Sequence, residues 1–129
     1  MTSLQRAAAF AQRALRLEDW QLDVEVSDRP PRWCASRKDF TKHTLGLSEA
    51  WIDHKVARIW VSPARTRAQN RARFSGESVS TVQVLFHEIA HVLFDDCGWK
   101  LDGSVGDESV VDRVAEVMER AWKGCRRSQ

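Results

Sequence analysis

Tyrosine is absent from this chain, and cysteine and histidine are scarce, with three and four residues respectively among 129. The cysteines Cys34, Cys97 and Cys125 are odd in number and widely spaced, and none forms a C-x-x-C pair. This spacing argues against a disulfide framework and against a four-cysteine zinc site. Free thiols are typical of a reducing compartment, so we expect a cytoplasmic protein.

Long hydrophobic runs are missing too. A transmembrane helix needs roughly 20 consecutive apolar residues, and no run in this chain approaches that length. Near the start of the chain, Arg6, Gln12 and Arg13 interrupt an alanine-rich stretch before the core of an export signal is complete. We therefore expect no export signal and no membrane partner.

The charge of the chain is close to balance, at a net +2, which neither requires nor excludes an acidic partner. Its 129 residues are near the commonest domain length, and 43% of them are hydrophobic, enough to build a core. No internal repeat divides the sequence. We expect a single domain over residues 1–129.

Apolar periodicity predicts helices at both ends of the chain and strands between them. Alternation from Trp20 to Val26 is typical of a strand with one buried face, and Pro30-Pro31 ends it. The expected elements are a helix over 3–17 capped by Ser3, strands over 20–26, 32–36 and 55–61, an ambiguous segment over 44–52, a helix from Ser78 or Ser80 to Phe94 or Asp95, and a helix over 107–123 ended by Gly124. This order predicts an α+β fold, in which helices back a small mixed sheet of three or four strands.

A polar stretch over residues 65–73 carries four arginines and no acidic residue: Arg65, Arg67, Arg71 and Arg73. It is interpreted as a solvated loop between the sheet and the central helix, because no aromatic residues lie between the arginines to stack on bases. A contact to nucleic acid or to an acidic substrate is the alternative interpretation.

The central helix contains an H-E-x-x-H motif formed by His87, Glu88 and His91. Residues four apart on a helix lie one turn above each other, so both imidazoles project from the same face and can hold one metal ion. Zinc is the commonest occupant of such a site. Glu88, beside the first ligand, is placed to act as a general base.

A third ligand must come from a carboxylate or a thiolate, because no histidine follows His91. Asp95 continues the column of His87 and His91, but three ligands on one straight helix diverge too far to meet. Glu108 is favoured, because it opens a second helix after a loop long enough to fold back across the first. The other candidates stay open; they are Asp95, Asp96, Cys97, Asp102, Asp107, Asp112 and Glu116.

The H-E-x-x-H motif followed by Glu108 and Asp112 resembles the gluzincin pattern of zinc metallopeptidases. The resemblance implies that Glu108 is the third ligand and that Asp112 hydrogen-bonds a ligating histidine, with His87 as the expected partner. The order of sheet, motif helix and glutamate-bearing helix is also similar to the smallest gluzincins and to SprT-like and repressor-cleaving peptidases of phages and bacteria. The fold that this implies is a compact zincin-like domain.

The function that these features predict is a zinc-dependent peptidase, with one zinc ion and a peptide or protein substrate. An extended substrate is expected to pair with the free edge of the strand at residues 56–61. One alternative is a non-catalytic, metal-stabilised module that binds nucleic acid or protein through residues 65–73. A zinc-dependent nuclease is a weaker alternative, because the small zincin-like endoribonucleases use three histidines. His43 and His54 are expected at the surface, and most tryptophans in the core.

Overall fold

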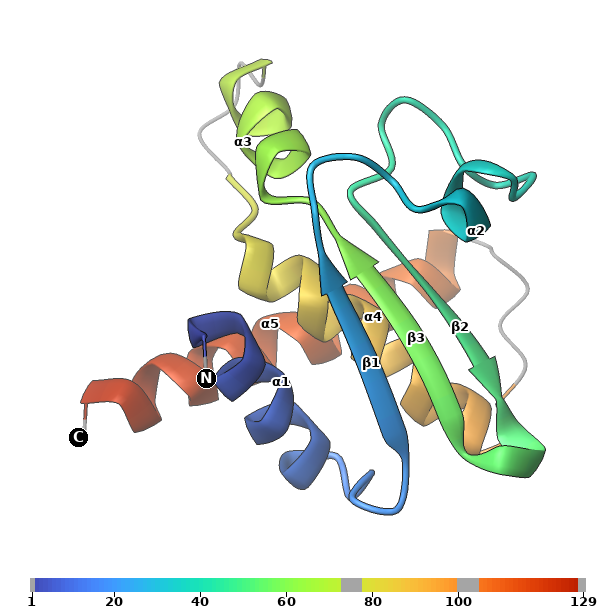
Figure 1. The fold of residues 1–129 in the computed structure, drawn as a ribbon. Coiled ribbons are helices and arrows are strands. Elements are labelled where there is room, and N and C mark those ends of the chain that lie inside the picture. Colours follow the sequence, from blue (N-terminus) through green and yellow to red (C-terminus); the bar gives the residue numbers. More distant parts are fainter. Residues whose placement is uncertain (1, 73–77, 100–104, 128–129) are drawn as a thin grey trace.

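A computed structural model of the chain describes residues 2–72, 78–99 and 105–127. Figure 1 shows a small twisted sheet with helices packed behind it. The elements in chain order are α1 (Ser3–Ala14), β1 (Gln21–Val26), α2 (Arg32–Ala35), β2 (Gly46–Trp51), the short helical turn η1 (Ile52–His54), β3 (Val56–Val61), α3 (Pro63–Ala72), α4 (Thr81–Asp96) and α5 (Val105–Arg127). The predicted α+β class with a mixed sheet is confirmed.

The strand order in the sheet is β1-β3-β2. β1 pairs with β3 in parallel, and β2 pairs with β3 antiparallel. The expectation that residues 56–61 offer a free edge to a substrate is therefore wrong, because β3 has a partner on both sides. Ile59, Trp60 and Val61 are all fully buried, which is typical of a central strand with both faces covered. The edges of the sheet belong to β1 and β2.

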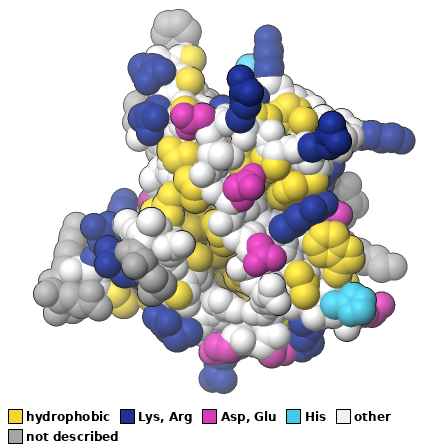
Figure 2. All heavy atoms as spheres, in the orientation of Figure 1, with side chains coloured by type: hydrophobic (Ala, Val, Ile, Leu, Met, Phe, Trp, Pro, Cys, Tyr) yellow, Lys and Arg dark blue, Asp and Glu magenta, His cyan; other side chains and the backbone are white. Residues whose placement is uncertain are grey.

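The core lies between the sheet and the helices α1, α4 and α5. Leu85, Phe86 and Ile89 of α4 are fully buried and meet Ile59 and Val61 of β3 there. The opposite face of the sheet, which faces the viewer in Figure 2, carries hydrophobic side chains interspersed with acidic and basic ones. α4 is thus the central helix that the sequence predicts, and it packs against the sheet, α1 and α5.

The first helix begins at Ser3, but its cap is Thr2, one residue before the predicted cap. The Thr2 hydroxyl, not Ser3, accepts a hydrogen bond from the Gln5 backbone N–H, and the Gln5 side chain accepts one from the Thr2 N–H. This reciprocal capping box satisfies two backbone donors at once. The helix ends at Ala14, before residue 17, and Arg16 then adopts the left-handed conformation at φ 58°.

The short strand expected over residues 32–36 is wrong, because these residues form the one-turn helix α2. Pro31 stands before its first turn, where a proline costs no hydrogen bond. The turn buries Cys34 completely and brings Trp33 over the Arg58 guanidinium of β3, 4.5 Å from the ring centre. The segment therefore covers part of the sheet face opposite α1, α4 and α5, and it adds no strand to the sheet.

The arginine-rich segment is also a helix rather than a loop. Pro63 opens α3, and the Ser62 hydroxyl accepts a hydrogen bond from the Arg65 backbone N–H. A polar residue at the cap and a proline in the first position are typical signals of a helix start. Asn70 then exchanges two hydrogen bonds with the backbone of Val79, so that α3 fixes the approach to α4.

The last helix is longer than predicted at both ends, from Val105 to Arg127. Gly124 lies inside this helix and does not end it. Among the described glycines, only Gly98 has the positive φ that is typical of a glycine after a helix end. A glycine in a helix interior costs about 1 kcal/mol relative to alanine, which a long packed helix tolerates.

Gly46, at the start of β2, lets α4 approach the sheet closely. A Cβ atom at this position would lie 2.8 Å from the Trp60 carbonyl oxygen and 2.9 Å from Cγ1 of Val84. Both distances are shorter than a side chain tolerates, so the absence of a side chain sets the spacing between β2 and α4.

Among the described residues, no helix has the length and apolar character needed to span a membrane.

Candidate metal centre

α4 places the two histidines of the motif one turn apart on one face. Ser80 caps the helix by accepting a hydrogen bond from the Gln83 backbone N–H. The Nε2 atoms of His87 and His91 lie 3.2 Å apart, with the two rings nearly edge to face. Their side chains are 19% and 25% exposed. Both rings are therefore partly open to solvent.

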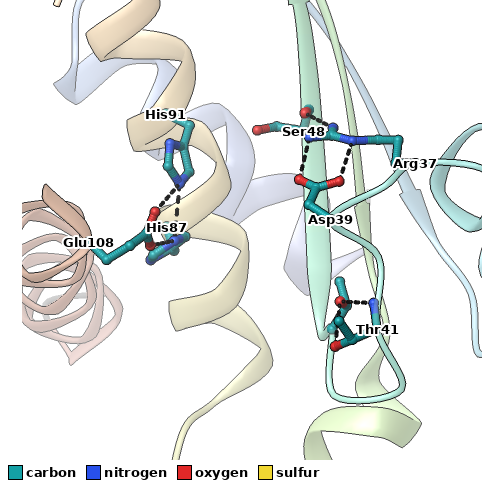
Figure 3. A network of polar contacts seen from close by, with 8 residues as sticks. Arg37, Asp39, Thr41, Ser48, His87, His91 and Glu108 are labelled. Atoms are coloured by element: carbon teal, nitrogen blue, oxygen red, sulfur yellow. Dashed lines mark hydrogen bonds and ion pairs between the residues drawn. The ribbon is translucent and has the colours of Figure 1, made fainter. Parts of the chain in front are cut away.

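α5 folds back along α4 and brings a carboxylate to the pair (Figure 3). Oε2 of Glu108 lies 3.1 Å from Nε2 of His87, and Oε1 lies 3.6 Å from Nε2 of His91. Ser80, at the first turn of α4, also contacts Glu119 of α5, so the two helices are tied at their other end. His87, His91 and Glu108 form the only group of potential metal ligands within the described ranges.

Asp112 lies one turn beyond Glu108 on α5 and contacts the other side of the His87 ring. Its Oδ1 atom is 2.8 Å from Nδ1 of His87. Because a carboxylate only accepts hydrogen bonds, Nδ1 carries a proton, and in the neutral ring Nε2 then has a lone pair. The contact that the resemblance implies between Asp112 and His87 is present.

The chemistry of these donors fits a cation. A neutral His87 presents the lone pair of Nε2 to a carboxylate oxygen at 3.1 Å, and two acceptors at that distance repel each other. Either a metal ion between them or a second proton on the ring removes the repulsion. Two atoms bound tetrahedrally to zinc at about 2.0–2.1 Å lie about 3.3–3.4 Å apart. The two Nε2 atoms at 3.2 Å, and Nε2 of His87 with Oε2 of Glu108 at 3.1 Å, are close to that spacing. The 3.6 Å contact of His91 is with the other carboxylate oxygen.

Glu88 lies beside the cluster, on the sheet side of α4. It is only 7% exposed, and no lysine or arginine among the described residues forms an ion pair with it. With His87 it lines a cleft of about 820 Å³. A buried carboxylate without a cationic partner, at the wall of a cleft, is suited to accept a proton.

The cleft extends from His87 along α4 and α5 towards the start of α4. Residues 44–46, which lead into β2, form one side, and successive turns of α5 form the other, from Asp112 to Lys123. This wall is not among the features predicted from the sequence. A signal for it was present, because Asp112, Glu116 and Arg120 recur at helical spacing and therefore share one face of α5.

The other candidate ligands lie outside the cluster. Asp102 is outside the described residues, so the structure does not place it. Cys97 caps the end of α4 and is exposed. Partial burial raises the pKa of the Asp95 carboxyl, and the nearby His91 acts in the opposite direction. None of the candidates other than Glu108 joins the two histidines within the described part of the chain; these are Asp95, Asp96, Cys97, Asp107, Asp112 and Glu116.

The arginines of α3 do not act as one group. The Arg65 guanidinium donates to the Thr44 carbonyl at 3.0 Å and lies over the rings of Phe40 and Trp60. Arg67 and Arg71 are exposed one turn apart, and Arg73 lies outside the described residues. Arg65 thus has a structural role, and the charge left for a nucleic acid or acidic partner is smaller than the sequence indicates.

Two further expectations concern histidines and tryptophans. His43 and His54 are exposed and lie outside the cluster, as predicted. Trp20 and Trp60 belong to the interior, whereas Trp51 and Trp99 are 40% and 53% exposed. The expectation that most tryptophans fill the core holds only in part.

The chain matches no protein-family model, no curated protein and no solved structure. What can be said of the site therefore depends on its residues and their geometry.

Proposed function

We propose that this protein is a zinc-dependent peptidase with a zincin-like α+β fold. His87, His91 and Glu108 would hold one zinc ion, and Asp112 would orient His87. One observation carries the proposal: Oδ1 of Asp112 lies 2.8 Å from Nδ1 of His87, so that Nε2 of the same ring is turned toward Glu108, 3.1 Å away. Such an outer carboxylate fixes ring orientation and raises the basicity of a metal-binding imidazole.

A zinc ion held by these residues would polarise a peptide carbonyl and lower the pKa of water beside it. The remaining chemistry belongs to the chain. The Glu88 carboxylate takes a proton from the attacking water and then donates it to the nitrogen of the leaving amine. The buried position of Glu88 at the cleft wall supports this role, because a carboxylate in that setting is not strongly solvated.

The cleft also indicates where a peptide would lie. β2 is the edge strand next to α4, and its first residue, Gly46, lines the cleft with His87 and Glu88. An extended peptide that adds to the edge of β2 would pass the motif helix, with main-chain hydrogen bonds that do not depend on its sequence. The substrate edge is therefore assigned to β2 in place of β3.

Glu88→Gln tests the proposal most directly. The variant should retain about one zinc ion per chain, because it removes no ligand, and its kcat/KM for a mixture of internally quenched random peptides should fall by about 100- to 10,000-fold. Metal content is measured by atomic spectroscopy and cleavage by fluorescence.

Glu116→Gln is the matched control, since Glu116 lines the same cleft but lies outside the cluster. Its activity should stay close to that of the unaltered protein. Equal cleavage by Glu88→Gln and the unaltered protein would exclude Glu88 as the base. A purified protein that takes up no zinc would overturn the proposed function as a whole.

A further inference from the structure

The free edge of β2 is defined by its pairing with β3. Gly46 lies opposite Val61, and Ser48 lies opposite Ile59. The Ser62 N–H donates to the Leu45 carbonyl, so Leu45 belongs to a hydrogen-bonded pair of the antiparallel ladder. Such pairs alternate with pairs whose polar groups point away. The N–H and C=O groups of Gly46, Ser48 and Ala50 therefore point to the free edge.

Arg37 occupies the middle of this edge (Figure 3). Its Nη1 donates to the Ser48 carbonyl at 2.6 Å. The same guanidinium donates to both carboxylate oxygens of Asp39, from Nε at 3.0 Å and from Nη2 at 2.7 Å. A guanidinium held at three points is oriented rigidly, so the contact with Ser48 is a defined feature and not a passing one.

This contact lies next to the candidate metal centre along the strand. Gly46 packs against Val84 of α4 and lines the cleft with His87 and Glu88. Ser48 is the next residue whose carbonyl points to the free edge. A peptide that paired with β2 from the cleft onward would need the Ser48 carbonyl as its next acceptor.

We propose that Arg37 closes the free edge of β2, and that an extended substrate pairs with it only after the guanidinium leaves the Ser48 carbonyl. This inference rests on the proposed peptidase function and adds a means of regulating it. Paired strands lie about 4.7–4.9 Å apart, and a substrate strand at that distance would place its own N–H group where Nη1 now lies. Asp39 holds the closed arrangement by fixing the other two donors.

The effect of closure can be expressed as an affinity. An extended peptide must displace the charge-assisted hydrogen bond of Arg37 before it pairs with the Ser48 carbonyl, and such a bond corresponds to roughly tenfold or more in affinity. Removing the guanidinium should therefore tighten the binding of an extended peptide by roughly tenfold or more. It should leave the binding of a short ligand, which never reaches Ser48, unchanged.

Two hydroxamates separate these cases, because the hydroxamate group binds zinc in a peptidase without being cleaved. Acetohydroxamate probes the metal centre alone, and tetra-alanyl hydroxamate adds an extended main chain that can pair with β2. Both are titrated by calorimetry into the zinc-loaded protein, into Arg37→Ala and into Asp39→Asn. Lys38→Ala is the matched control, since it removes one exposed positive charge beside Arg37 without touching the edge.

The expected result is that tetra-alanyl hydroxamate binds roughly tenfold tighter to Arg37→Ala, with a smaller gain in Asp39→Asn and none in Lys38→Ala. Acetohydroxamate should bind all four proteins equally. Thermal melting checks that the variants fold, and Asp39→Asn serves as the test if Arg37→Ala does not.

Three other outcomes have distinct meanings. Equal binding of the extended hydroxamate by all four proteins would overturn the proposal that Arg37 closes the edge to a substrate. Arg37 would then only satisfy a carbonyl on the exposed edge of β2. Weaker binding to Arg37→Ala would also overturn it, because Arg37 would then assist the substrate. If acetohydroxamate does not bind even with zinc present, the proposed function fails and this inference fails with it.

Discussion

Two polar clusters flank β2, and they differ in whether the chain itself supplies the cation (Figure 3). In one, the Arg37 guanidinium faces three acceptors, the two Asp39 oxygens and the Ser48 carbonyl. In the other, His87, His91 and Glu108 gather acceptors around a point where the chain places no lysine or arginine among the described residues.

The difference separates a structural cluster from a candidate binding site. The Arg37 cluster is complete, because each acceptor meets a donor at hydrogen-bond distance. In the histidine cluster, a neutral His87 donates its Nδ1 proton to Asp112, so its Nε2 atom and the Glu108 carboxylate face each other as two acceptors 3.1 Å apart. Removing a residue from the first cluster should leave metal binding unchanged, whereas removing a residue from the second should weaken it.

The largest effect is expected for Glu108→Ala. Loss of an outer partner of a ligand weakens metal binding by about 10- to 100-fold, so loss of a ligand should weaken zinc binding by more than about 100-fold. Competition with a chromophoric chelator measures the affinity. Asp39→Asn, which alters the complete cluster, should leave it unchanged. Equal zinc affinities for Glu108→Ala and the unaltered protein would remove Glu108 from the ligand set.

A smaller effect is expected for Asp112→Asn. The amide retains the shape of the side chain but not its charge, so it holds the His87 ring less strongly, and zinc affinity should fall by about 10- to 100-fold. The same chelator competition measures this change, with Glu116→Gln as the control one turn further along α5. A loss as large as that of Glu108→Ala would instead make Asp112 a direct ligand.

The smallest effect concerns Cys34, beneath the complete cluster. Burial raises the pKa of its thiol from 9.0 to about 12, with Arg37 acting in the opposite direction. Iodoacetamide at pH 8 should therefore modify the exposed Cys97 and Cys125 but not Cys34 in the folded protein. Mass spectrometry identifies the modified residues, and rapid modification of Cys34 would show that the segment over it opens.

The same shift has a consequence for stability. Between pH 9 and about 12 the thiol ionises in the unfolded chain but not in the folded protein. The contribution of Cys34 to the free energy of unfolding is therefore complete below pH 9 and falls as the pH rises through this window. Urea unfolding at several alkaline pH values measures the slope. Cys34→Ala should reduce it, and an identical slope in that variant would contradict the shift.

Local features of the candidate site could be predicted from the sequence. The spacing of His87 and His91 places both rings on one helix face, because a helix turns once in 3.6 residues. The structure also brings Glu108 to them, which the resemblance to gluzincins implied. The ligand roles themselves stay predictions until metal binding is measured.

The arrangement of the sheet was harder to predict. β3 was expected to offer an edge, although its consecutive buried residues Ile59, Trp60 and Val61 were the available signal of a central strand. The polar composition of residues 65–73 is also typical of a loop, whereas Pro63 and the Ser62 hydroxyl are the local signals of the helix start. No local pattern in the sequence predicts the contact between Arg37 and Ser48, since it joins a residue after α2 to one in β2, eleven positions away.

The sequence by itself determined which residues could act together on each helix. Helical periodicity groups His87, Glu88 and His91 on one helix, and it places Asp112 one turn after Glu108 on the next. Helical spacing depends only on local backbone geometry, so it can be read without the fold. Only the tertiary structure decided that α5 returns to α4, that β2 and not β3 borders the cleft, and that Arg37 closes its edge. These are contacts between distant segments, set by how the core packs, and residue spacing does not encode them.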